Sequence, residues 1–238
     1  MRHIEHHSWF EDKSAIDGNI IDTLTTAVAI HNGQFKQRYP AEYEYGKAIC
    51  TKIGGIINTA VVTDNSANKL NNCSLNAVGL VTRQPTHLVE ADASAILRNR
   101  DYFFWSRYVQ PVADQITYIS HYLDLKLEES EYCLDSLEGS SWYPVDQGNI
   151  CQSEAYSQMN EYADGTRFVV GVGLMEDLIR DNSHYLYAEK INGNLIFIDG
   201  QTNMFSDLEP TFYSDSFDFS HINIPLVTGM MFLAVILQ

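Results

Sequence analysis

The chain has 238 residues, of which 45% are hydrophobic, so it is long enough to bury one large core or two small ones. Acidic residues outnumber basic ones, with 31 Asp and Glu against 15 Lys and Arg, and the formal net charge is −16. Because phosphate binding requires clustered cations, this balance argues against nucleic acid and anionic membrane surfaces as partners.

The first part of the chain has helical patterns. Residues 1–13 are polar, without the apolar segment of a Sec-type signal peptide, and are expected to be flexible. Apolar residues recur at helical spacing over Ile16–Ala29, with Ser14 as an N-cap, which predicts a helix. A second helix is predicted over Ala41–Ile57, ended by Gly54-Gly55 or continuing weakly past it.

Helical patterns continue through the middle of the chain. An asparagine-rich polar loop, residues 63–72, precedes Cys73–Val81, a segment of small and apolar residues that can form a helix. Apolar faces then predict helices over Ala91–Arg100 and Val109–Leu125, and Ser153–Ala163 is predicted as one more helix.

Strand patterns replace helical ones from residue 167 onward. The predicted strands cover Phe168–Gly173, Tyr185–Lys190, Leu195–Ile198 and the C-terminal run Ile222–Leu237. Pro225 and Gly229 interrupt the C-terminal run, and its apolar part is too short to span a bilayer. We therefore expect a buried terminal strand and no integral membrane segment.

The order of helices followed by strands predicts the fold class. Helices over about 14–163 and strands over about 167–238 are typical of an α+β fold, in which a helical N-terminal part packs on a C-terminal antiparallel β-sheet. No break in composition divides the chain, so residues 1–238 are expected to form a single domain.

Cysteines are few and widely spaced, at Cys50, Cys73, Cys133 and Cys151. They form no CxxC pair and no close Cys/His spacing, which argues against a zinc site, and no metal or cofactor is expected. They are too sparse for a disulfide scaffold, so a reducing compartment fits best. Cys50 and Cys133 fall in segments whose pattern is that of helix interiors.

One predicted β-hairpin carries a histidine on its first strand and an aspartate at the end of its second. His184 lies just inside the first strand, and Asp199 follows the apolar run Leu195–Ile198. A histidine oriented by a carboxylate forms two thirds of a nucleophilic catalytic triad. Taken alone, Asp199-Gly200-Gln201 is read as a plain turn after a strand.

Cys73 is the candidate nucleophile for this pair. It stands between a polar loop and a segment that can form a helix, and the first turn of a helix favours a thiolate. Free backbone N–H groups there can also bind an oxyanion, together with a donor such as Asn72. Cys151 also follows a polar loop and is the rival, and a lone cysteine before an apolar run is more often an inert buried thiol.

Three segments carry a resemblance to a known family: Asn72-Cys73-Ser74, Ser183-His184-Tyr185 and Gly193–Thr202. Together they resemble the papain-like toxin domain, a family that includes bacterial effector glutamine deamidases. The match covers the second half of the chain and the Cys73 junction. The resemblance implies a papain-like fold.

Residue roles follow from the same resemblance. It implies that Cys73 is the nucleophile, that His184 is the general base and acid, and that Asp199 holds the imidazole. Gln201 matches the glutamine that follows the aspartate in that family, and we expect it to support the site.

The resemblance also implies an activity and a setting. We expect a bacterial effector, secreted into the host cell cytosol without a Sec signal peptide, that deamidates a glutamine of a host protein through a thioester. Two alternatives use the same first step, namely a transglutaminase and a papain-like cysteine protease. A catalytically silent module that binds a host protein is the alternative from a different class.

Overall fold

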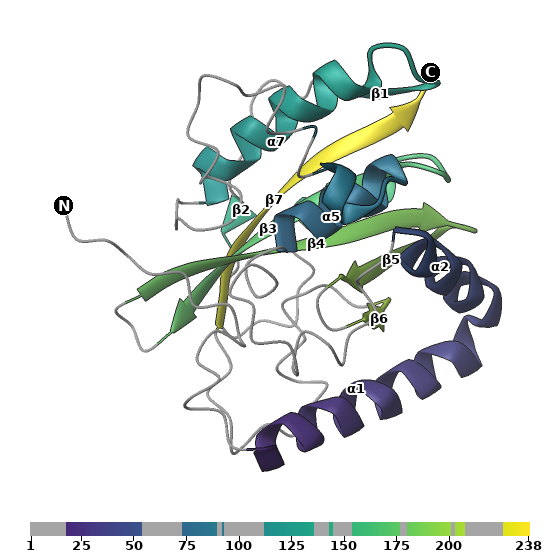
Figure 1. Ribbon diagram of the computed structural model, residues 1–238, viewed down its shortest axis with the longest axis vertical. Helices are drawn as coiled ribbons and strands as arrows, with labels where there is room; N and C mark the ends of the chain where they lie inside the picture. The colour runs from purple at the N-terminus through teal and green to yellow at the C-terminus, as the bar shows by residue number, and fades with distance from the viewer. Residues whose placement is uncertain are drawn as a thin grey trace.

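The computed structural model describes residues 18–53, 73–89, 92, 112–135, 143–144, 154–176, 180–200, 203–207 and 226–238. Helices and an antiparallel sheet make up these ranges, so the fold is α+β, as the order of sequence patterns predicts (Figure 1). Predictions for residues 1–13 and for most of the helix over Ala91–Arg100 lie outside the described residues.

The main helices are α1 (Gly18–Arg38), α2 (Pro40–Ile53), α5 (Cys73–Thr82), α7 (Val112–Leu127) and α8 (Glu154–Glu161). Helix α1 runs nine residues beyond the predicted end at Ala29, through Asn32 and Gly33. It ends just before Tyr39, because Pro40 disfavours helical geometry in the residue that precedes it and itself suits the first turn of α2.

The strands are β1 (Tyr132–Leu134), β2 (Tyr143–Pro144), β3 (Arg167–Glu176), β4 (Arg180–Ile191), β5 (Asn194–Asp199), β6 (Met204–Ser206) and β7 (Leu226–Leu237). Their order across the sheet is β1-β7-β3-β4-β5-β6, with β2 also paired to β7, and all pairs are antiparallel. The C-terminal run is therefore an interior strand of the sheet, in agreement with the prediction of a buried strand.

Two short strands lie in the span predicted to be helical. Strands β1 and β2 both precede residue 163, and Cys133, predicted in a helix interior, pairs with Ile236 of β7. That prediction is wrong because a three-residue strand shows no periodicity of its own. Its conformation is imposed by hydrogen bonds to a strand about a hundred residues further along the chain.

Helices cover both faces of the sheet. On one face α7 packs on β1 and β7, α5 on β3 and β4, and α1 on β6, and Figure 1 shows α5 between α7 and α2. On the other face α8 packs on β5 and β7. Alternation along β3 divides the core accordingly, because Val169 faces the first cluster whereas Phe168 and Val170 face the second.

The outer edge of β6 is bonded to a side chain of α1. The carboxamide of Asn32 donates from Nδ2 to the backbone oxygen of Asn203 at 2.8 Å. Its Oδ1 accepts the backbone N–H of Phe205 at 3.0 Å. One side chain therefore makes the pair of bonds that a neighbouring strand makes.

None of the helices in the described ranges combines the length and the apolar character that crossing a bilayer requires.

Candidate functional site

Cys73 is the first residue of α5 and its side chain is half-buried. The eight residues that follow it, Ser74 to Val81, are all buried, because α5 is the helix that packs on the centre of the sheet. The N–H groups of a helix's first turn have no partners within the helix and carry partial positive charge. The thiol therefore stands where an anion is favoured, as the loop-to-helix junction in the sequence predicts.

His184 and Asp199 form an ion pair on neighbouring strands. His184 Nε2 lies 3.2 Å from Asp199 Oδ2, and each side chain is 6% exposed. The β4–β5 register ends at Tyr187↔Ile198, and continuing it makes His184 and Asp199 diagonal neighbours on one face. The hairpin thus brings together the two groups that the sequence pairs, although His184 lies inside β4 rather than near its start.

The thiol of Cys73 also interacts with the imidazole. His184 lies beyond the last paired residue of β5, and its imidazole interacts there with the side chain of Cys73. Burial disfavours the charged imidazole, but the Asp199 carboxylate and then Cys73 outweigh burial and raise the pKa of His184 to about 10. At neutral pH the imidazole is therefore protonated, beside the Asp199 carboxylate and the side chain of Cys73.

The geometry assigns a role to each ring nitrogen. Asp199 engages Nε2, which fixes the orientation of the ring. This leaves Nδ1 as the ring nitrogen for any exchange of a proton with Cys73. A thiol next to an imidazole that is in turn held by a carboxylate is the arrangement that activates a cysteine nucleophile.

Asn76 joins the helix of Cys73 to the strand of Asp199, and sequence reasoning missed it. Its Nδ2 donates to the backbone oxygen of Gly200 at 3.5 Å, and its Oδ1 accepts the hydroxyl of Thr86 at 3.2 Å. Gly200 permits this approach, since a Cβ there would lie 2.8 Å from Asn76 Cβ. The signal was present, because a polar residue three positions after Cys73 lies on the same side of a helix.

The remaining cysteines differ from Cys73 in their surroundings. Cys50 is 2% exposed in α2, and burial raises the pKa of its thiol to about 12, which makes it a poor nucleophile at neutral pH. Cys133 is half-buried in β1. The rival Cys151 and the supporting residues Asn72 and Gln201 lie outside the described residues.

Within the described ranges, no group of three or more His, Cys, Asp and Glu side chains is arranged to hold a metal ion. A scan against models of protein families and a search of curated proteins both found nothing that matches the chain.

Proposed function

We propose that the chain is a cysteine-dependent amidohydrolase with a papain-like fold, in which Cys73, His184 and Asp199 act as a catalytic triad. One observation carries the proposal: a thiol at the N-terminus of a central helix interacts with a buried imidazole that a carboxylate holds at 3.2 Å. The chain order of helix, histidine strand and acid strand is that of papain-like enzymes.

The first half-reaction forms a thioester. The Cys73 thiolate attacks the carbon of a carboxamide, and the resulting oxyanion accepts hydrogen bonds from N–H groups of the first turn of α5. His184 then transfers a proton from Nδ1 to the departing nitrogen as the C–N bond breaks. Ammonia leaves, and the acyl group stays on sulfur.

The second half-reaction releases the acid. Neutral His184 takes a proton from water, and the hydroxide attacks the thioester carbon. The C–S bond breaks, the carboxylic acid departs, and the thiolate and the imidazolium are restored. Asp199 keeps its charge throughout and stabilises the imidazolium.

The proposed substrate is a glutamine side chain of a host protein, which becomes glutamate. This choice rests on the resemblance of the Asp199–Thr202 segment to effector glutamine deamidases. The same thioester yields a cross-link if a lysine amine replaces water, and a cut chain if the attacked carbonyl belongs to a peptide bond. Delivery by a bacterium into the host cytosol is part of the same proposal.

Intact-mass analysis of host proteins incubated with the chain separates these reactions. A Gln-to-Glu shift supports the deamidase, whereas a cross-link or a fragment assigns the transglutaminase or the protease. Cys73→Ala should abolish every product, and Cys50→Ala is the matched control because it removes a thiol remote from His184. Full activity in Cys73→Ala would refute the triad.

A further inference from the structure

The end of α5 opposite Cys73 has an unusual termination. Arg83, the residue after the helix, has φ 60, a left-handed conformation in which glycine is the common residue. The backbone N–H of Gln84 donates to Gly79 O at 3.0 Å and closes the last turn. Gly79 is required there, since a Cβ would lie 2.9 Å from Gln84 O. An arginine therefore occupies a left-handed position that favours glycine, and its side chain is held by several bonds.

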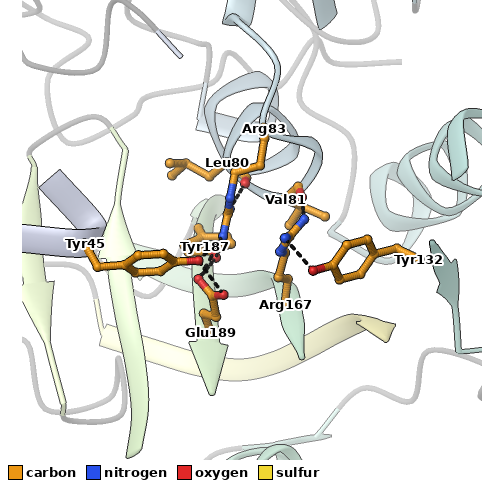
Figure 2. A network of polar contacts seen from close by, with 8 residues as sticks. All are labelled: Tyr45, Leu80, Val81, Arg83, Tyr132, Arg167, Tyr187 and Glu189. Atoms are coloured by element: carbon orange, nitrogen blue, oxygen red, sulfur yellow. Dashed lines mark hydrogen bonds and ion pairs between the residues drawn. The ribbon is translucent and has the colours of Figure 1, made fainter. Parts of the chain in front are cut away.

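The guanidinium of Arg83 bonds to three groups besides its own helix. Its Nη2 donates to the hydroxyls of Tyr45 at 3.0 Å and Tyr187 at 2.9 Å, and it pairs with Glu189 Oε2 at 2.9 Å. Its Nη1 donates to Leu80 O, and both tyrosine hydroxyls donate to the Glu189 carboxylate. Figure 2 shows Arg83, Tyr45 and Tyr187 meeting at the Glu189 carboxylate, whose side chain is 5% exposed.

A second arginine reaches the same helix end from β3. Arg167 Nη1 donates to Val81 O at 3.1 Å, and its Nη2 donates to the hydroxyl of Tyr132 at 2.8 Å (Figure 2). Its guanidinium lies 4.0 Å from the centroid of the Tyr132 ring. Two cations therefore bond to consecutive carbonyls at the negative end of the helix dipole, and through them α5 is bonded to β3 and β4.

The cluster of Arg83, Tyr187 and Glu189 and the proposed catalytic pair use the same two elements. Helix α5 carries Cys73 at one end and Arg83 just past the other, roughly 15 Å away along the axis. Strand β4 carries His184 and, five residues later, Glu189. Between these ends the helix contacts the sheet mainly with apolar side chains such as Ala77 and Val78, whose packing is not directional, and Asn76 Nδ2 adds one long hydrogen bond, of 3.5 Å, to Gly200 O. The shorter, charge-assisted bonds at the Arg83 end are therefore the stronger restraint on the axial position of α5, and so on the position of Cys73.

We propose that Arg83, with Tyr187 and Glu189, is a positioning device that holds α5 on β4 so that the thiol of Cys73 stays at the imidazole of His184. This inference rests on the proposed role of Cys73 as nucleophile. The positioning role explains why an arginine occupies this left-handed position. A glycine would end the helix without strain, but it has no side chain to bond to Glu189 of β4.

The test is a double variant, Arg83→Gly with Glu189→Gln, which removes both buried charges together and relieves the backbone strain. The iodoacetamide rate of Cys73 at pH 7 is measured by peptide mass analysis, at a temperature where circular dichroism shows each protein folded. We expect a fall of about tenfold or more in this rate. In the deamidation assay we expect a lower kcat with little change in KM.

Matched variants separate positioning from stability. Leu123→Ala opens a cavity under α7, away from Arg83, and should lower the melting temperature while the alkylation rate of Cys73 is retained. Arg83→Lys keeps the charge beside Glu189 but loses the planar fork, so its rate should lie between those of the wild type and the double variant. If the double variant does not fold, Arg83→Lys carries the test alone.

Two negative results have different meanings. If the wild-type alkylation rate of Cys73 does not exceed that of His184→Gln, the proposed function fails. A second result would leave the triad standing but refute the positioning role. In that case Cys73 of the wild type is alkylated faster than Cys73 of His184→Gln, yet the folded double variant is alkylated at the wild-type rate. If the double variant does not fold, the same comparison is made with Arg83→Lys.

Discussion

The two ends of α5 are both bonded to the sheet through charged groups, but the groups differ in kind. At the N-terminal end, the Asp199 carboxylate holds the imidazole of His184, with which Cys73 interacts. At the C-terminal end, the guanidiniums of Arg83 and Arg167 stay charged and are bonded to carbonyls and hydroxyls. The three residues of the proposed triad thus meet at the N-terminal end, whereas two arginines bond α5 to the sheet at the C-terminal end.

The helix dipole favours both arrangements. An anion is stabilised at the N-terminus and cations are stabilised at the C-terminus, so a thiolate at Cys73 and the two arginines all lower the free energy of the same helix. The groups at both ends of α5 therefore hold this short helix in place on the sheet. Substitutions at the two ends should have different effects, on the reaction at the Cys73 end and on stability at the Arg83 end.

Asp199→Asn should lower the deamidation rate by about 10² to 10⁴-fold, because a neutral amide stabilises the imidazolium poorly and permits the wrong ring tautomer. Rates of glutamate formation measured by mass spectrometry give the comparison. Asp124→Asn, which makes the same change on the exposed side of α7, should leave the rate unaltered. Equal rates in the two variants would mean that the N-terminal end is not catalytic.

Glu189→Ala should lower the free energy of unfolding by roughly 3–5 kcal/mol, because Arg83 then stays mostly buried without its counter-charge. Urea denaturation followed by circular dichroism measures the change. The control is Glu44→Ala, which removes the exposed ion pair with Lys36 and should change the stability little. A loss no greater than that of Glu44→Ala would show that the C-terminal attachment contributes nothing.

The contribution of His184 to the free energy of unfolding should fall as the pH rises from 6.5 to 10. The folded protein keeps the His184 proton up to a pKa of about 10, whereas the unfolded chain releases it near 6.5, so rising pH favours unfolding within this window. Urea denaturation at a series of pH values should show a shallower fall for His184→Gln than for the wild type. Parallel curves would contradict the raised pKa.

Gly200→Ala should destabilise the protein by about 1–3 kcal/mol and slow the alkylation of Cys73. The new Cβ would lie 2.8 Å from Asn76 Cβ, so α5 must shift away from the end of β5. Thermal denaturation and the iodoacetamide rate report the two effects. Gly33→Ala in α1, where a Cβ meets nothing within 4 Å, should instead stabilise the helix by about 0.5–1 kcal/mol.

Much of the architecture could be predicted because it is encoded locally. The apolar runs of β3, β5 and β7 and the periodic face of α7 are visible in the sequence, and the predicted bounds lie within a few residues of those in the structure. The meeting of Cys73, His184 and Asp199 was predicted from the helix junction and the hairpin.

Other features depend on contacts between distant segments. β1 pairs with β7, and the guanidinium of Arg83 bonds to side chains of α2 and β4. Neither partner is indicated by the local sequence, and an arginine at a helix end is read as a surface charge. Asn76 was missed for the same reason, since its partner Gly200 lies 124 residues away.

The bonds between Asn32 and the outer edge of β6 have a consequence for self-association. An unpaired strand edge is a template on which another chain can add a strand, and such addition leads to aggregation. At this edge the carboxamide of Asn32 already occupies the carbonyl of Asn203 and the N–H of Phe205. A peptide that paired with this edge of β6 would first have to displace the Asn32 side chain of α1. The helix therefore protects this edge from strand addition and aggregation.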